Sequence, residues 1–127
     1  MTDQIKTPLF QALASLNFES IMVTEPTDKP GASRIVFVNE MFTEMTGYSA
    51  DEVIGQTPGV LQGTRTDPEV LERLAEDLSA GRTFHGQTIN YRKDGTPFEI
   101  EWKVTPVLDD ASKVTHYVAV QRCIGEA

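Results

Sequence analysis

Hydrophobic and polar residues alternate most regularly in the last third of the chain. In the segment of residues 97–107, apolar and polar side chains alternate from residue 98 to residue 105. This period of two is typical of a strand with one buried face. The apolar positions are Phe98, Ile100, Trp102 and Val104. Residues 83–93 and 113–124 also have strand character, and turn-forming residues at 93–96 and 109–112 separate the three segments. The pattern predicts a three-stranded antiparallel meander.

The first half of the chain contains the pattern of two further strands and a short helix. Residues 20–26 and the beginning of 34–42 are rich in strand-forming side chains, and residues 27–33 between them favour a turn. Asn39 is well placed to cap the helix that follows, and Gly47 to end it. We therefore expect a pair of strands followed by a helix.

Helix signals dominate the middle of the chain. Ser49, with Glu52 three residues later, forms a capping-box pattern for a short helical turn that Gly55 closes. The clearest helix spans residues 66–81, where Asp67 precedes a proline in the first turn. The apolar face of this helix consists of Val70, Leu71, Leu74 and Leu78. Together the elements predict an α+β domain with one antiparallel sheet and its helices on one face.

A separate amphipathic helix is predicted near the N-terminus. Its apolar residues recur at near-helical spacing and are Ile5, Leu9, Leu13 and Leu16. We expect residues 1–17 to form a helical cap that packs on the domain or on a partner, and residues 18–127 to form the domain itself.

Composition narrows the classes of function. The net charge of −8, from 19 acidic and 11 basic residues, disfavours binding to nucleic-acid backbones and to anionic membranes. The only cysteine is Cys123, so an internal disulfide is excluded, and no apolar run is long enough for a membrane span. These features favour a cytoplasmic protein. The chain also lacks a Gly-rich phosphate loop and the usual metal-ligand spacings, so we expect no enzymatic activity.

Four segments resemble the PAS family, and among its branches most resemble the flavin-binding LOV domains and the LOV-like redox sensors. They are "FVNEMFTEMTGYSADEVIG", "LQG", "NYRKDGTPF" and "YVAVQR", and the similarity covers residues 18–124. The resemblance implies a five-stranded antiparallel sheet with strand order 2-1-5-4-3, whose short helices enclose a flavin pocket.

The resemblance also assigns roles to individual positions. In LOV domains a turn with the pattern G-x-N-C-R-F-L-Q holds the flavin, and its Cys forms a light-driven adduct. In this sequence the Asn, Cys and Arg places are Thr57, Pro58 and Gly59, while the Gln is kept as Gln62. A second phosphate-binding Arg is replaced by Ala75.

In the strands, the ring-contacting Asn is kept as Asn90 and the signalling Gln as Gln121, while a second Asn is replaced by Ile100.

A flavin ring requires an apolar slot with a few amides at one edge, because its pyrimidine edge carries both donors and acceptors. The polar candidates for this site are Thr57, Gln62, Asn90 and Gln121. The candidates for the apolar wall are Ile35, Val60, Leu61, Ile100, Trp102 and Ala119, the last of which leaves room for a flat ring.

Pro58 decides between light sensing and redox sensing. Without a thiol in that turn, we expect no cysteinyl–flavin adduct, and we interpret the pocket as a sensor of flavin redox state in which Gln121 switches. Arg65 and Arg73 are the nearby candidates for the missing phosphate contacts, and FAD is slightly favoured over FMN.

Two alternatives remain at this stage. One alternative is a PAS module that binds no cofactor and serves in dimerisation or protein interaction. The other is a domain that binds haem, as other PAS domains do. Haem requires an axial His on the helix at 66–81, which has none, and we expect His85 and His116 on the surface. In either flavin or cofactor-free form we expect a homodimer through the N-terminal helix and the outer sheet face, acting on an unknown output domain or partner.

Overall fold

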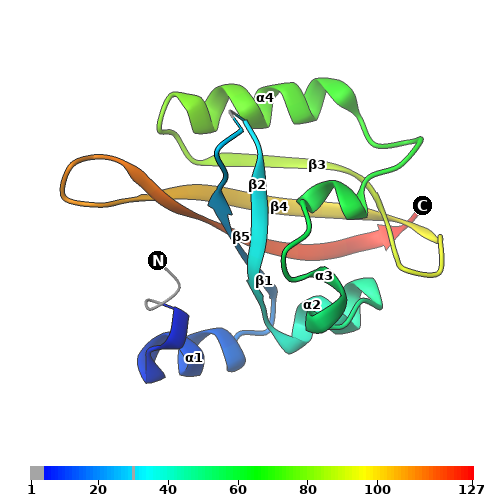
Figure 1. The fold of residues 1–127 in the computed structure, drawn as a ribbon. Helices are drawn as coiled ribbons and strands as arrows, with labels where there is room; N and C mark the ends of the chain where they lie inside the picture. Colours follow the sequence, from blue (N-terminus) through cyan, green and yellow to red (C-terminus); the bar gives the residue numbers. More distant parts are fainter. Residues whose placement is uncertain (1–4, 30) are drawn as a thin grey trace.

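Five strands form one antiparallel sheet in the order β2-β1-β5-β4-β3, as the resemblance to the PAS family implies (Figure 1). The computed structural model describes residues 5–29 and 31–127. The strands are β1 (Ser20–Pro26), β2 (Ser33–Val38), β3 (Phe84–Tyr91), β4 (Pro97–Leu108) and β5 (Val114–Glu126). The two longest strands, β4 and β5, pair along almost their whole length. Because β5 also pairs with β1 on its other side, it lies in the centre of the sheet.

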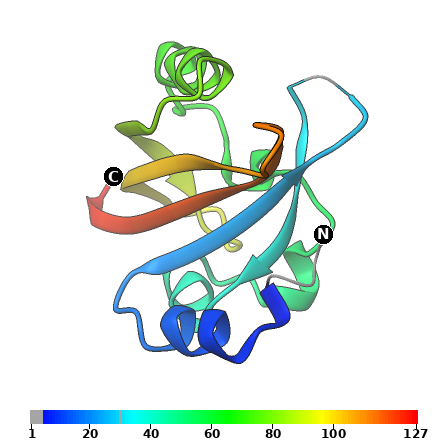
Figure 2. The ribbon, with the colours of Figure 1, turned by 90° about the vertical axis from the view of Figure 1, so that its left-hand side faces the viewer.

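The helices pack around this sheet, the first of them on Phe37 of its outer face and the others over its inner face. They are α1 (Pro8–Ser15), α2 (Glu40–Thr46), α3 (Ala50–Val53), the 3-10 helix η2 (Pro58–Leu61) and α4 (Pro68–Ser79). Figure 1 shows α4 along β3 at the top of the view and α2 and α3 at the bottom. Figure 2, from the side, shows that α4 stands away from the β1–β2 turn. No helix in the described part of the chain is long and apolar enough to cross a membrane.

The cap residues predicted from the sequence are confirmed, and Asn39 does more than cap α2. Its Oδ1 accepts hydrogen bonds from the backbone N–H of Phe42 at 3.1 Å and of Ile21 at 2.9 Å. Its Nδ2 donates to the carbonyl oxygens of Ala14 and Glu19, both at 3.0 Å. One buried side chain therefore joins α1, β1 and α2.

The other helix ends follow the same local rules. Gly47 ends α2 with a φ of +81°, in the left-handed region that glycine adopts without strain. Ser49 and Glu52 form both hydrogen bonds of a capping box, and the Asp67 side chain accepts from the N–H of Glu69 at the start of α4.

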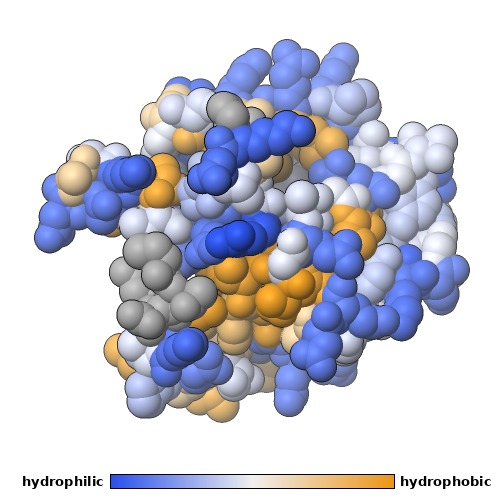
Figure 3. All heavy atoms as spheres, in the orientation of Figure 1, coloured by the Kyte–Doolittle hydropathy of each residue, from blue (hydrophilic) through white to orange (hydrophobic). Residues whose placement is uncertain are grey.

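The core lies between the helices and the inner face of the sheet. The four alternating residues of β4 are all buried on that face, as predicted: Phe98, Ile100, Trp102 and Val104. Val70, Leu74 and Leu78 of α4 pack against this core, yet no residue of α4 is fully buried. The helix thus leaves space between itself and the sheet. In the orientation of Figure 1, the surface of the molecule is apolar near its centre, below the polar outer side of α4 (Figure 3).

The N-terminal helix forms, but its leucines do not pack on the domain. Leu9, Leu13 and Leu16 are 71%, 65% and 80% exposed. The helix contacts the domain through another side, where the Phe10 ring meets Phe37 of β2 at a centroid distance of 5.0 Å. The helix thus packs on the domain, one of the two expected partners, but through Phe10 and the buried Ala14 and not through its leucines. The boundary at residue 17 stays a prediction, and residues 1–4 of that cap lie outside the described residues.

Candidate functional site

A cavity of about 640 Å³ lies between α4, η2, the β1–β2 turn and the inner face of the sheet. We call it the main cavity. Its sheet side is lined by Met22, Thr24, Trp102, Val104, Tyr117 and Ala119, and its helix side by Leu71, Leu74, Ala75 and Leu78. Cavities of a few hundred to a thousand Å³ with mainly apolar walls are typical of sites for small organic ligands.

Strand pairing explains why small and large residues meet on this wall. Ala119 of β5 lies opposite Met22 of β1 and Val104 of β4, and all three face inward. Because Ala119 has only a methyl group, the centre of the sheet is hollow at this point. Ala75 has the same effect on the opposite wall, where it faces the cavity from α4.

Four of the predicted site residues line the main cavity. They are Thr57, Gln62, Trp102 and Ala119. The other apolar candidates lie in the core next to the cavity instead of lining it: Ile35, Leu61 and Ile100 are completely buried, and Val60 packs against them partly buried. The structure therefore brings some of the predicted residues together on the cavity wall, whereas the other apolar ones pack in the core behind that wall.

The two amides predicted on the strands are buried on the inner face but do not line the main cavity. Asn90 of β3 is 8% exposed, and its side chain makes no hydrogen bond within the described residues. Gln121 of β5 is 3% exposed, and its Oε1 accepts a hydrogen bond from the Ser20 hydroxyl at 3.0 Å. Neither amide has a fully buried polar atom without a partner, so each keeps hydrogen-bonding capacity that water or a ligand can use.

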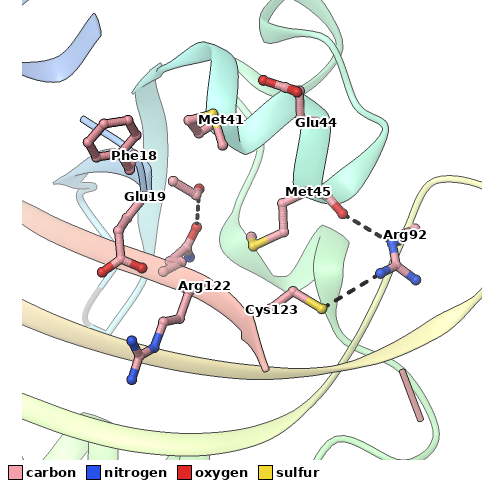
Figure 4. Close-up of a pocket in the computed structure, with 10 residues that line it drawn as sticks. Phe18, Glu19, Met41, Glu44, Met45, Arg92, Arg122 and Cys123 are labelled. Atoms are coloured by element: carbon pink, nitrogen blue, oxygen red, sulfur yellow. Dashed lines mark hydrogen bonds between the residues drawn. The ribbon is translucent and has the colours of Figure 1, made fainter. Parts of the chain in front are cut away.

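Gln121 also lines a second, smaller pocket of about 380 Å³, which we call the side pocket (Figure 4). Met45 of α2 and Cys123 of β5 both line it, and the Cys123 thiol points toward Arg92, with 3.8 Å between Nη2 and Sγ. Arg92 also donates two hydrogen bonds to Glu126, which lowers the pKa of that carboxyl.

The position of Cys123 bears on the missing thiol. The chain's single cysteine is exposed in the side pocket and does not line the main cavity, whereas Pro58, at the start of η2, does. No cysteine sulfur therefore faces the main cavity.

The positions at which the resemblance to LOV domains implies phosphate-binding arginines also face the main cavity. Gly59 and Ala75 both line it, and neither has a charge. Arg73 points elsewhere: its Nη1 donates to the carbonyl of His85 at 2.8 Å, and its guanidinium lies 4.8 Å from the Phe84 ring. Arg65 does not line the cavity in this structure either.

A set of hydrogen bonds ties the loop between η2 and α4 to β3 and so positions Gln62. The Thr66 hydroxyl donates to the carbonyl of Ile89 at 2.6 Å and accepts from the N–H of Gly63 at 3.0 Å. A Cβ added at Gly63 would lie 2.4 Å from the Tyr91 ring, so the loop approaches β3 as closely as glycine permits.

The histidines do not favour haem. His85 is exposed and lies 2.7 Å from Glu101, as expected of a surface residue. The expectation for His116 is wrong, because it is 2% exposed. Its place near the start of β5 is flanked by β1 and β4, whose strands extend past it. Neither His lines the main cavity, and the described residues contain no cluster of three metal-binding side chains.

Sequence reasoning missed several residues of the cavity wall. Met22 and Thr24 were recognisable only as strand residues, because which face of β1 points inward depends on its pairing with β5. Lys29, in the β1–β2 turn, also lines the cavity, and no local pattern marks it.

Comparison with known proteins places this fold and cavity in context. A family model described as PAS domain matches residues 19–124. The chain is 37% identical over 118 residues to phototropin-2 of Oryza sativa subsp. japonica, covering 93% of this chain and 13% of that protein. It is 35% identical over 114 residues to a blue-light-activated histidine kinase of Brucella anthropi, covering 88% of this chain and 22% of that protein.

Among solved structures, the LOV domain of a blue-light activated histidine kinase from Erythrobacter litoralis superimposes with a TM-score of 0.77 at 30% identity. The match covers 87% of this chain and 99% of that one. The chain thus spans a minor part of the curated relatives it matches, whereas it matches almost the full length of this solved LOV domain.

Replacement of Thr66 tests how the site is positioned. Thr66→Val removes two hydrogen bonds of a buried hydroxyl, so we expect the free energy of unfolding to fall by about 1–3 kcal/mol. Thr64→Val, at an exposed position of the same loop, serves as the control and should change stability by less than about 0.5 kcal/mol. Urea denaturation monitored by Trp102 fluorescence measures both, and equal stabilities of the two variants would contradict this assignment.

Proposed function

Because the chain belongs to the PAS domain family, we propose that it is a sensory domain that binds a flavin in the main cavity and reports the redox state of that flavin to a partner or output domain. The observation that carries the proposal is a mainly apolar cavity of about 640 Å³ with the amides of Asn90 and Gln121 buried on the adjoining sheet face and no thiol on its wall. Its LOV-domain relatives imply the flavin.

The residues present fit such a cofactor. Trp102 and Val104 offer an apolar floor, and Ala119 leaves the space that a flat ring needs. Gln121 lies two residues beyond Ala119 on the same face of β5, which corresponds to roughly 7 Å along a strand. A ring that lies along β5 over Ala119 therefore brings its polar edge to Gln121, while Gln62 contacts it from η2.

Gln121 and Ser20 supply the switch. A bound flavin supplies a ring that takes up electrons and protons, and so changes which hydrogen-bonding groups it presents. The Gln121 side chain carries both an acceptor and a donor, so by rotating its amide it can pair with either a donor or an acceptor on the ring. At present Oε1 accepts from the Ser20 hydroxyl; a rotated amide would present Nε2, and the Ser20 oxygen would become the acceptor. The change would pass from β5 to β1, next to α1.

Light sensing through a cysteinyl adduct does not fit this chain. Pro58 stands at the cavity wall where LOV domains carry the reactive cysteine, and Cys123 lies in the side pocket. We favour FAD over FMN because the wall of the main cavity includes residues of both the exposed β1–β2 turn and α4, between which an adenosine would extend outward.

The alternative is a PAS module that binds no cofactor. One observation favours a role in association whichever form is correct: Leu9 and Leu13 of α1, Leu16 directly after it and Phe18 are all largely exposed. Several large apolar side chains exposed in one short segment favour an interaction site. We propose that a second copy of the chain covers it, together with the outer face of the sheet, in a symmetric dimer.

Filling the cavity tests the proposed function. Ala119→Leu places three more carbon atoms in the space assigned to the ring, so we expect flavin affinity to fall at least about tenfold, the scale of overpacking strain of 1–3 kcal/mol. Val118→Leu is the matched control, because it lies on the other face of the same strand. Titration of riboflavin with each apoprotein gives the affinities, and circular dichroism verifies the folds. Equal affinity in the two variants would contradict a flavin in this cavity.

Replacing Gln121 tests the switch. Gln121→Leu should retain the flavin but lose the difference in hydrogen-exchange rate of β1 amides between oxidised and reduced protein, because Ser20 loses its partner. Gln87→Leu makes the same change at an exposed position of β3. If the exchange difference persists in Gln121→Leu, the amide does not transmit the redox state.

A charge on the leucine face of α1 tests the dimer. Leu13→Glu should give a monomer by size-exclusion chromatography with light scattering, while Ser15→Glu, on another side of the helix, should remain a dimer. A monomeric parent protein at the same concentration would rule out this association.

A further inference from the structure

The main cavity has one charged residue on its wall among those the structure describes, and that residue is Lys29. The chain as a whole has a net charge of −8. An anionic group brought to this protein is therefore repelled at long range and attracted at the cavity mouth, where Lys29 stands.

The backbone of Lys29 is held in place by the β1–β2 turn. Its N–H donates to the Thr27 hydroxyl at 3.3 Å, and its carbonyl accepts from the N–H of Ala32 at 3.1 Å. Thr27 in turn donates its N–H to the carbonyl of Ala32 at 3.0 Å, which closes the turn. Lys29 forms no salt bridge with any described carboxylate, so its ammonium group is available to a ligand.

Uncommitted hydroxyls surround the same opening. Thr57 precedes η2 but makes no capping hydrogen bond with its side chain. Ser33 at the start of β2 and Ser79 at the end of α4 also line the cavity, and no hydrogen bond involves their side chains within the described residues. A cation with several free hydroxyl donors is a chemical environment that suits a phosphate group.

The arginines that the sequence suggests for this task are less suitable. Arg73 is occupied by the His85 carbonyl and the Phe84 ring, and Arg65 lies on the loop outside the cavity wall. The two wall positions at which LOV domains carry arginines are Gly59 and Ala75.

We propose that Lys29, assisted by the hydroxyls of Thr57 and Ser33, binds the phosphate group that FMN and FAD share. This assignment rests on the proposed function. The phosphate would then leave the cavity toward the β1–β2 turn, and the β1–β2 turn would become part of the cofactor site.

Comparison of riboflavin with FMN and FAD tests the proposal, because riboflavin has the ring but no phosphate. We expect Lys29→Gln in the full chain, stripped of flavin, to weaken FMN binding about tenfold, the scale of one charge-assisted hydrogen bond. The affinity for FAD should fall by a similar factor, and the affinity for riboflavin should change less than about twofold. Flavin fluorescence titration measures all three affinities. In the parent protein, salt at about 0.5 M screens charges and should lower the affinity for FMN but not for riboflavin.

Three further variants make the assignment specific. Lys113→Gln, in the β4–β5 turn, is a matched control that should leave FMN affinity unchanged. A loss selective for FMN in Arg65→Gln or Arg73→Gln, but not in Lys29→Gln, would assign the phosphate to an arginine and overturn the proposal.

The test separates this inference from the proposed function. If riboflavin binds and Lys29→Gln leaves FMN affinity unchanged, the phosphate assignment is wrong and the flavin site stands. If neither riboflavin nor FMN binds the parent protein, both are wrong.

Discussion

The register of β5 between β1 and β4 is the constraint on which the rest of the structure depends. It sets Ala119 opposite Met22 and Val104, and Gln121 opposite Ser20 and Trp102. Because side chains alternate along a strand, a slip of one residue would turn this whole set to the outer face. The hollow at Ala119 and the buried amide beside it therefore have a common origin.

The cavity and the core are two solutions to the same packing problem. At the α2 end, Phe42 and Val53 are fully buried in the core over the sheet. At the α4 end, the leucines of the helix reach the core only in part. Unfilled space costs stability in proportion to its volume, and a ligand that binds only the folded state offsets that cost. A protein of this design is expected to be more stable with its cofactor than without it.

Much of the fold was predictable because its signals are local. Asn39, Gly47 and the Ser49–Glu52 pair act on their own helix ends, and alternation in β4 identifies its buried face without knowledge of its neighbours. The burial of His116 depends instead on the strands on both sides of β5.

The parts of the site that escaped prediction join segments distant in sequence. Lys29 meets Thr57 and Ala75 only because the β1–β2 turn, η2 and α4 surround one opening. The direction of the α1 leucines was likewise open, since an amphipathic pattern does not say whether its face meets the domain or a partner.

The central claim is a flavin that responds to reduction and forms no cysteinyl adduct, and the visible absorption spectrum of the protein as purified tests it most directly. The spectrum is recorded in the dark, after blue light and then after dithionite. The account predicts a structured flavin band that shows no light-driven adduct and bleaches reversibly on reduction. A protein that stays colourless after refolding with FAD or FMN, or one whose flavin forms an adduct in light, would contradict it.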